Sequence, residues 1–165
     1  MEIYRGSRVW IERIPVSLPN GITSEKVIVH PGNAVTILPV KGDRFILLRQ
    51  YRYAIGQYIY EAPAGTMEEG EDPIRTAHRE LIEESGFAAK TMAPKGFIYT
   101  TPGYTDEKIY LFIASDLTPS QEYGKDEDEV IEVVDVSLND VATMIRDGRI
   151  CDAKTICLIY RYMEG

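Results

Sequence analysis

Cysteine, histidine and long apolar runs are scarce in this sequence. The 165 residues include two cysteines, Cys151 and Cys157, and two histidines, which form neither a disulfide framework nor a zinc-site spacing. No apolar run approaches the length of a membrane span. The first residues mix charged and apolar side chains and lack the uninterrupted apolar stretch of a secretory signal. We therefore expect a cytoplasmic protein with no membrane partner.

Basic residues are also outnumbered. The chain has 18 Lys and Arg against 26 Asp and Glu, which gives a formal net charge of −8. Because affinity for nucleic acids comes mainly from clustered Lys and Arg, we expect no nucleic-acid partner. An acidic protein still binds an anionic substrate when metal ions reverse the local charge.

The order of the strand and helix signals predicts an α+β fold, an α/β/α sandwich, in a single domain over residues 1–165. Apolar and β-branched segments separated by turns such as Asn20-Gly21 predict the strands. The expected strands cover residues 8–14, 24–30, 34–39, 44–50, 58–61, 97–101, 108–114 and 130–135.

Three helices are predicted where a capping residue precedes an amphipathic segment. The first also has a proline at its first helical position and a glycine just beyond its end. The expected helices are 73–85, with Asp72 as N-cap and Gly86 beyond the end, then 138 to about 148 after Ser137, and 153–162 after Asp152.

The first predicted helix carries a concentration of acid. Glu80, Glu83 and Glu84 stand at positions i, i+3 and i+4, so they share one face and repel one another. Hard divalent cations, which prefer oxygen ligands, would offset that repulsion. Taken alone, this spacing is more typical of a solvated acidic surface.

The residues around this helix make the pattern far more specific. The segment starts at Gly65, has Glu71 after five residues, and continues after seven more as Arg-Glu-Leu-x-Glu-Glu-x-Gly-Phe from Arg79 to Phe87. All of these fixed positions resemble the Nudix box, and the similarity extends to most of the chain. The resemblance implies a Nudix fold with a mixed β-sheet, and a hydrolase that uses Mg²⁺, or Mn²⁺ in its place.

The resemblance also assigns metal ligands. Glu80 and Glu84 would be the main ligands, Glu83 would assist them, and the carbonyl of Ala64 would complete the coordination. The metals would bridge a diphosphate, neutralise its charge and activate a water molecule for attack on phosphorus.

The other box residues would support these ligands. Glu71 and Arg79 would hold the loop and orient the glutamates, as residues around a metal site commonly do. Gly65 would permit a tight backbone, and Gly86 would end the helix.

Three features outside the box resemble ADP-ribose diphosphatases, which would make ADP-ribose the substrate and AMP and ribose 5-phosphate the products. They are the lead-in Tyr60-Glu61-Ala62-Pro63-Ala64, which has alanine where leucine is more usual, the strand end Arg49-Gln50-Tyr51-Arg52, and a proline-glycine segment fifteen residues beyond Phe87. A guanidinium matches phosphate oxygens bidentately. The implied substrate-binding residues are Arg52, Pro102, Gly103 and Glu107.

A second acidic cluster, Asp126-Glu127-Asp128-Glu129, precedes the last predicted strand. In ADP-ribose diphosphatases a glutamate from a loop at this point acts as catalytic base. Glu127 is the preferred base and Glu129 the second choice, with Gly124 as a hinge. A merely solvated loop is the alternative.

Residues 1–31 resemble the N-terminal arm that exchanges between subunits in such enzymes. The resemblance implies a homodimer with this antiparallel strand pair in the interface and residues 32–165 as the catalytic core. An aromatic side chain of the arm would stack on adenine. Tyr4 and Trp10 are both candidates, and a purely structural Trp10 is equally compatible with the sequence.

Alternative functions remain open at this stage. The same chemistry on another nucleotide sugar, such as GDP-mannose, is the nearest one. A non-catalytic nucleotide-sugar sensor is disfavoured because all three box glutamates are present. A messenger-RNA decapping enzyme is disfavoured by the net charge of −8.

Overall fold

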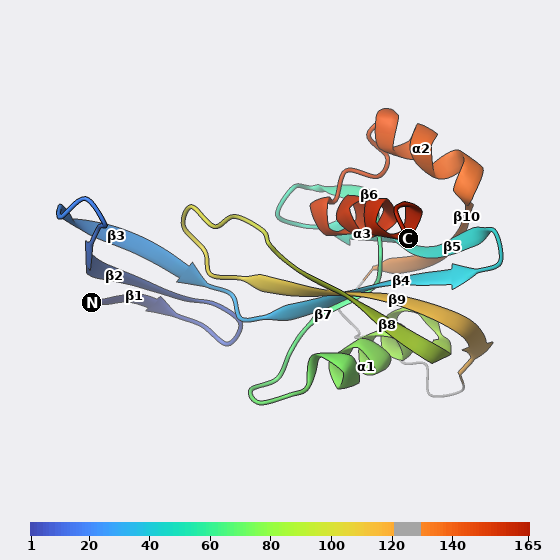
Figure 1. Ribbon diagram of the computed structural model, residues 1–165, viewed down its shortest axis with the longest axis horizontal. Helices are drawn as coiled ribbons and strands as arrows, with labels where there is room; N and C mark the ends of the chain where they lie inside the picture. Colours follow the sequence, from blue (N-terminus) through green and yellow to red (C-terminus); the bar gives the residue numbers. More distant parts are fainter. Residues whose placement is uncertain (121–129) are drawn as a thin grey trace.

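The computed structural model describes residues 1–120 and 130–165. These residues form a large sheet with helices on both faces and a smaller sheet that projects to one side (Figure 1). The elements, in chain order, are β1 (Glu2–Arg5), β2 (Trp10–Ser17), β3 (Thr23–His30), β4 (Ala34–Lys41), β5 (Arg44–Arg52), β6 (Gln57–Glu61), β7 (Ala64–Thr66), α1 (Pro73–Ser85), β8 (Phe87–Tyr99), β9 (Lys108–Pro119), β10 (Ile131–Ser137), α2 (Leu138–Arg146) and α3 (Ala153–Met163).

The projecting sheet is the N-terminal arm, with strand order β1-β2-β3 and antiparallel pairing throughout. The predicted Asn20-Gly21 turn joins β2 to β3, and Gly21 takes a positive φ of 83°, a conformation that glycine adopts without steric cost. The sequence predicted a pair of strands here, and the structure adds β1 as a third. Its four residues are all exposed, so no alternation of apolar and polar side chains marked it as a strand.

The large sheet has the strand order β10-β5-β4-β9-β8, with β6 paired to β5 and β7 paired to β4. Strands β4 and β9 are parallel and the other pairs are antiparallel, which confirms the predicted mixed sheet. Strand β8 begins at Phe87, well before the predicted start at residue 97. Its early residues are half-exposed and include charged side chains, which hid the strand pattern.

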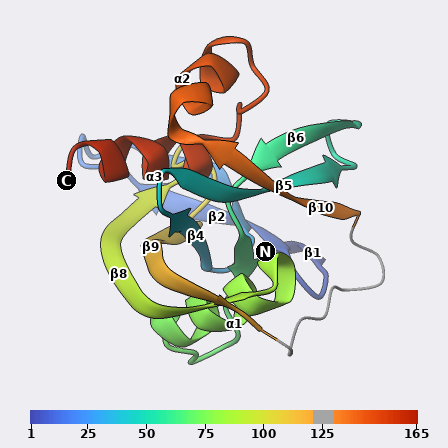
Figure 2. The same ribbon diagram turned by 90° about the vertical axis from the view of Figure 1, so that its right-hand side faces the viewer.

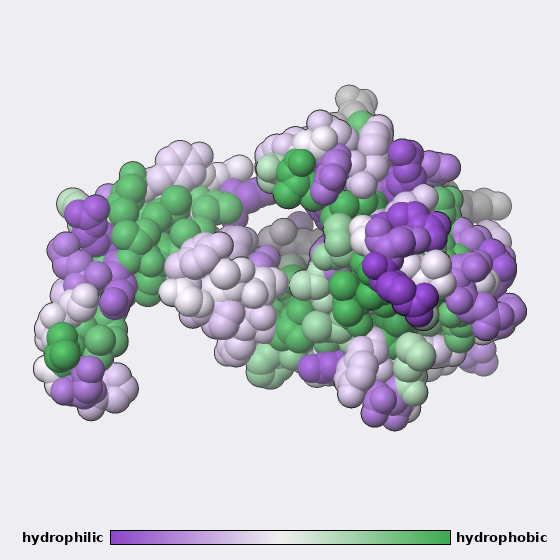
Figure 3. All heavy atoms as spheres, turned by 90° about the horizontal axis from the view of Figure 1, so that it is seen from above, coloured by the Kyte–Doolittle hydropathy of each residue, from purple (hydrophilic) through white to green (hydrophobic). Residues whose placement is uncertain are grey.

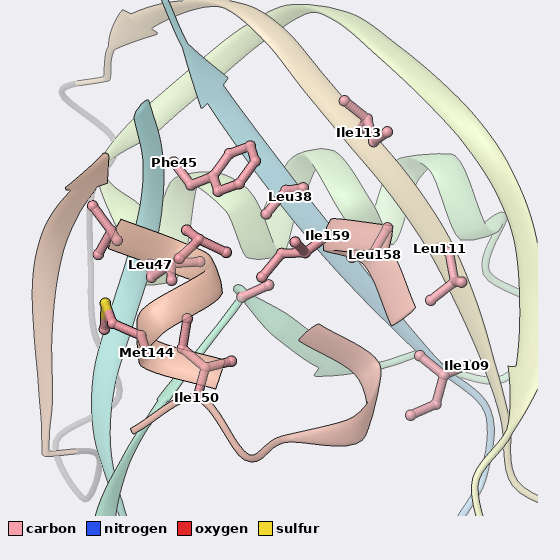
Figure 4. Close-up of a cluster of buried hydrophobic side chains, with 13 residues drawn as sticks. Leu38, Phe45, Leu47, Ile109, Leu111, Ile113, Met144, Ile150, Leu158 and Ile159 are labelled. Atoms are coloured by element: carbon pink, nitrogen blue, oxygen red, sulfur yellow. The ribbon is translucent and has the colours of Figure 1, made fainter. Parts of the chain in front are cut away.

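The sheet lies between two helical layers. Helix α1 covers one face, and α2 and α3 cover the other (Figure 2). On the α2–α3 side, buried residues such as Phe45, Leu111 and Leu158 meet between the helices and the strands (Figure 4). On the α1 side, Ala77 and Leu81 pack against Val35 and other sheet residues. Burying each such large apolar side chain stabilises the fold by roughly 1.5–3 kcal/mol. The predicted α/β/α sandwich is therefore confirmed.

The helix ends follow the capping signals in the sequence. The Asp72 side chain accepts a hydrogen bond from the Ile74 N–H at 3.1 Å. At the other end of α1, Gly86 adopts the left-handed conformation and its N–H bonds to the Ile82 carbonyl. The side chains of Ser137 and Asp152 cap α2 and α3. Within the described residues, no helix has both the length and the apolarity needed to cross a membrane.

Candidate active site

One face of α1 gathers the acidic side chains that the sequence predicted to act together. Glu80, Glu83 and Glu84 lie on this helix, with Arg79 among them. Arg79 Nη1 donates to Glu80 Oε1 at 2.7 Å and to Glu83 Oε2 at 3.0 Å, and its Nη2 donates to Glu71 Oε2 at 3.4 Å. We call Arg79 and these three carboxylate partners the box cluster. Its four residues lie close together in the sequence, and the Arg79 guanidinium pairs with all three carboxylates.

Two of the glutamates reach the backbone that precedes the helix. Glu84 is 5% exposed, and its Oε2 accepts a hydrogen bond from the Ala64 N–H at 2.7 Å. A Cβ atom at Gly65 would overlap the Glu80 carboxyl group. Glycine at this position therefore lets the Glu80 carboxylate approach the chain, which accounts physically for the tight backbone expected there.

The oxygen donors on this face suit a hard cation such as Mg²⁺ or Mn²⁺. In the part of the chain that the structure describes, however, no three His, Cys, Asp or Glu side chains converge on one metal position. The carboxylates of Glu80 and Glu83 are instead paired with the Arg79 guanidinium. Glu80 and Glu84, packed at Ala64–Gly65, fit a hard cation by donor type and placement. Glu83 would join them on leaving Arg79.

The electrostatics of the box cluster favour the charged forms of Arg79 and Glu71. Partial burial disfavours the charge on Arg79, but Glu80, Glu71 and Glu83 outweigh burial, so the pKa of the guanidinium is raised above its ordinary value. The backbone N–H of Glu68, together with Arg79, holds the pKa of the Glu71 carboxyl below its ordinary value. The cluster is thus a stable set of paired charges in this arrangement.

A second ionic cluster lies at the end of β5. Arg52 donates through Nε and Nη2 to the two carboxylate oxygens of Glu61, at 2.6 and 2.8 Å. Lys154 Nζ, in the first turn of α3, donates to Glu61 Oε2 at 2.6 Å and to Asp152 Oδ1 at 2.9 Å. We call these four residues the buried ionic group, because Glu61 is only 1% exposed and Lys154 only 12%.

The predicted substrate residue Arg52 belongs to the buried ionic group and is also influenced by the charge of Glu84 on α1. Its burial lowers the pKa of the guanidinium, but hydrogen bonding and charge from Glu61, and the charges of Glu84 and Asp152, raise it more, so the net shift is upward. The influence of Glu84 means that Arg52 lies within the electric field of the α1 acids. The Arg52 side chain remains 40% exposed, so a ligand can still reach it.

Sequence reasoning missed the parts played by Glu61 and Lys154. Ninety-three residues separate the two in the chain, and no spacing rule connects them. One signal was present, because Lys154 follows the N-cap Asp152 closely and a positive charge there opposes the helix dipole. Such a lysine needs acidic partners, and both of its partners are carboxylates.

Gln50 is a further residue that the sequence analysis did not single out. It precedes Arg52 by two positions on β5, so both side chains point to the same side of the strand. Gln50 is 4% exposed, and its Oε1 is buried without a hydrogen-bond partner among the described residues. A buried acceptor of this kind is normally satisfied by water or a ligand.

The predicted substrate segment with Pro102, Gly103 and Glu107 lies in the loop between β8 and β9. Its hydrogen bonds join it to the arm: the Val29 N–H donates to the Tyr104 carbonyl at 2.9 Å. Glu107 accepts a hydrogen bond from the hydroxyl of a threonine in the same loop. Pro102 and Gly103 are exposed, and contact with a substrate at these residues remains a proposal.

A cavity of about 510 Å³ lies where the arm, this loop and β7 meet. Trp10 lines it, stacked on His30 with ring centroids 4.1 Å apart, and the Arg5 guanidinium lies 4.9 Å from the Trp10 centroid. His30 Nδ1 lies 2.7 Å from Asp106 Oδ2, which ties the loop to the arm. Trp10 therefore already has a ring partner and a cation, as a structural tryptophan would. Tyr4 is exposed.

The two acids predicted as catalytic base, Glu127 and Glu129, lie outside the described residues, as does the predicted hinge Gly124. The neighbouring residue Val130 is described. Its carbonyl accepts a hydrogen bond from the Tyr51 N–H at 3.2 Å, which places Val130 beside the end of β5.

Comparisons with known proteins identify the family. The NUDIX domain family model matches residues 30–158. The chain is 40% identical to an ADP-ribose pyrophosphatase of Bacillus subtilis (strain 168) over 99% of this chain and 89% of that protein. It is 37% identical to a methanol dehydrogenase activator of Bacillus methanolicus, over 99% of this chain and 89% of that protein.

A GDP-mannose pyrophosphatase of Cronobacter sakazakii (strain ATCC BAA-894) is 30% identical over 84% of this chain and 77% of its own length. Among solved structures, one described as an ADP compounds hydrolase superposes with a TM-score of 0.88 at 26% identity, covering 99% of this chain and 89% of that chain. The matched family, the box residues on α1 and the shared fold lead to one conclusion: this chain belongs to the Nudix family of hydrolases.

Proposed function

We propose that this enzyme hydrolyses the diphosphate bond of ADP-ribose, giving AMP and ribose 5-phosphate, with Mg²⁺ as the cofactor and Mn²⁺ able to replace it. One observation carries the proposal: the Glu80 and Glu84 carboxylates pack against the Ala64–Gly65 backbone, next to a strand end that presents Arg52. The Bacillus subtilis relative that matches almost the whole chain is an ADP-ribose pyrophosphatase, which supports this substrate.

Glu80, Glu84 and the Ala64 carbonyl would hold the divalent ion, with Glu83 assisting. When bound, the ion supplies neutralisation of the phosphate charge and a more acidic water. Without a bound metal ion, the Arg79 guanidinium pairs with Glu80 and Glu83. A bound divalent ion would take the place of Arg79 as the positive partner of these carboxylates, and it would offset the repulsion between the like charges on α1.

Arg52 would bind the diphosphate. Its Nε and Nη2 are engaged by Glu61, which leaves Nη1 and the exposed edge of the guanidinium for phosphate oxygens. The side chain stays charged, because its pKa is raised. The loop with Pro102, Gly103 and Glu107 would contact the rest of the substrate from the side of the arm.

The cavity between the arm and β7 would receive the nucleoside. Its volume of about 510 Å³ lies in the range typical of small-molecule sites. It opens beside Met67, which follows the Ala64–Thr66 strand of the box. Because Trp10 is already stacked on His30, adenine would displace the Arg5 guanidinium to reach the other face of the indole.

A loop glutamate would act as the base, with Glu127 preferred and Glu129 second. Single Glu127→Gln and Glu129→Gln variants assign the role. General-base catalysis contributes about 10²–10⁴-fold, so the variant that lacks the base should lose that factor in kcat while the other retains most of its activity. Equal, near-native rates in both variants would exclude this segment as the source of the base.

We also propose a homodimer formed through the arm. The arm exposes large apolar side chains, among them Ile3, Ile22 and Val27, and hydrophobic surface is prominent on it (Figure 3). Contiguous apolar patches of this kind commonly mark interfaces. Light scattering at several concentrations should give twice the chain mass, and Val27→Lys should lower it. A monomer at all concentrations would overturn the proposal.

A nucleotide-sugar panel with Mg²⁺ tests the proposed reaction. ADP-ribose should have the highest kcat/KM, with AMP and ribose 5-phosphate as products, and chelation of the metal should abolish turnover. GDP-mannose is the specific alternative, since a GDP-mannose pyrophosphatase is among the relatives. Equal or better turnover of GDP-mannose would reassign the substrate. Absence of turnover of every nucleotide sugar would favour a non-catalytic sensor.

A further inference from the structure

Lys154 is a buried lysine in the first turn of the C-terminal helix α3, outside every segment assigned to the reaction so far. Its ammonium is paired with Glu61 and Asp152 at 2.6 and 2.9 Å. Glu61 in turn holds Arg52 by a two-point hydrogen bond. The chain of contacts therefore runs from α3, through one carboxylate, to the guanidinium on the substrate side.

The geometry of Glu61 explains how it can act as the link. Glu61 lies opposite Leu48 in the β5–β6 register, and Arg52 follows Leu48 by four residues, so both side chains project from the same side of the hairpin. Three donors converge on the Glu61 carboxylate. Two come from Arg52 and one from Lys154, which leaves the carboxylate little freedom to rotate.

The same turn of α3 also holds Ala62, the residue that follows β6. Thr155 Oγ1, fully buried, accepts a hydrogen bond from the Ala62 N–H at 2.8 Å and donates to Asp152 Oδ2 at 2.5 Å. Glu61 and Ala62 are thus anchored at successive positions by one helix end. The segment continues directly into the Ala64–Gly65 backbone against which Glu80 and Glu84 pack.

Stability alone is a weak reason to keep this lysine. A buried ion pair stabilises the fold little more than apolar residues of similar volume would, because both charges lose their hydration. What such a pair does provide is a defined geometry. The pKa of Lys154 supports a permanently charged partner: burial lowers it, but Asp152 and Glu61 raise it more, so the net shift is upward.

We propose that Lys154 is a positioning residue of the active site: it fixes the Glu61 carboxylate, and through it the orientation of the Arg52 guanidinium towards the substrate diphosphate. The part of this inference that concerns the substrate diphosphate rests on the proposed function. The orientation of Arg52 can be measured without any turnover.

A double-mutant cycle tests the linkage. Lys154→Met should lower kcat/KM for ADP-ribose by about 10–100-fold, the range for residues that orient other residues of a site without touching the ligand. The control Lys90→Met, at an exposed lysine, should keep the wild-type kcat/KM. Arg52→Lys should also lower it. Combining Arg52→Lys with Lys154→Met should add nothing further, because Lys154 acts on the substrate only through the Glu61–Arg52 contact, which Arg52→Lys already disrupts. Multiplying effects would overturn the inference.

A second pair separates positioning from fold stability. Glu61→Gln combined with Lys154→Met removes one acid together with one ammonium, which restores the charge balance of the buried ionic group, so the unfolding midpoint should recover relative to Lys154→Met. The activity should not recover, since Arg52 has lost its carboxylate. Recovery of both would show that Lys154 acts only through stability, which contradicts the inference.

An NMR measurement makes the result independent of catalysis. The Nε–H resonance of Arg52, assigned by its loss in Arg52→Lys, should be protected from exchange in the wild type and in Lys90→Met, and should lose protection in Lys154→Met. An unchanged resonance in Lys154→Met would overturn the inference. If the wild type hydrolyses no nucleotide sugar while the Arg52 resonance responds as expected, the proposed function fails and the positioning of Arg52 by Lys154 stands.

Discussion

The box cluster and the buried ionic group are two sets of paired charges that differ in how far apart their residues lie in the sequence and in how deeply their central residue is buried. The box cluster is assembled by residues close in sequence around α1, and Arg79 in it remains partly exposed. The buried ionic group joins β5, β6 and α3 across the chain, and its central Glu61 is almost fully buried. The two clusters differ most at the acid that joins their charges: Glu61 is 1% exposed, whereas Glu83 of the box cluster is 43% exposed. We therefore expect loss of Glu61 to act mainly on stability and loss of an α1 glutamate to act mainly on activity.

The sharpest contrast between the clusters is the cost of losing one acid. Glu61→Ala leaves Arg52 without its carboxylate and the buried Lys154 with Asp152 as its remaining acid, so we expect a loss of about 3 kcal/mol in the free energy of unfolding. Urea denaturation measures it. The matched control is Glu132→Ala, which removes an exposed acid paired with Arg49 and should cost less than about 1 kcal/mol. Similar losses of stability in Glu61→Ala and Glu132→Ala would contradict the expected difference between a buried and an exposed acid.

The α1 glutamates proposed as metal ligands should respond in activity rather than in stability. Glu84→Gln preserves shape and an acceptor for the Ala64 N–H but removes the charge offered to a cation. Loss of several kcal/mol of metal-assisted stabilisation corresponds to a fall in kcat/KM of about 10²–10³-fold. Steady-state kinetics with saturating Mg²⁺ measure this fall. Hydrolysis at the native rate would remove Glu84 from the proposed metal site.

A smaller change acts on the box cluster through shape. Gly65→Ala places a methyl group where the Glu80 carboxyl now lies. Because the end of a flexible side chain can move aside, we expect less than about 1 kcal/mol of lost stability but a fall of about 10–100-fold in kcat/KM. Glu80→Gln in the Gly65→Ala background should add little. Native kinetics for Gly65→Ala would mean that the position of Glu80 is not critical.

The smallest expected effect is a pH dependence of stability at Glu71. Its folded-state pKa is lowered, with the Glu68 N–H as the main cause, so its carboxylate contributes stability above its ordinary pKa of 4.5, and that contribution is lost as pH falls through the lowered value. The stability difference between wild type and Glu71→Gln should therefore be constant near neutral pH and shrink in acid. A difference that grows in acid would have the wrong sign.

The same contrast explains what could be predicted from the sequence. Helix α1, its caps at Asp72 and Gly86, and the acids on its face depend on spacings of a few residues, which are visible in the sequence. Strand β8 was predicted too short, since the period of its early residues is masked by exposed and charged side chains. The contact between Glu61 and Lys154 arises only when the ends of β6 and α3 meet, and no local pattern encodes it.

The central claim is that the α1 glutamates bind a divalent cation, and Mn²⁺ titration followed by electron paramagnetic resonance tests it directly. The wild-type protein should take up Mn²⁺ in a saturable way, with competition by Mg²⁺, and a variant combining Glu80→Gln with Glu84→Gln should lose that uptake while remaining folded. Equal Mn²⁺ binding by the two proteins would contradict the account.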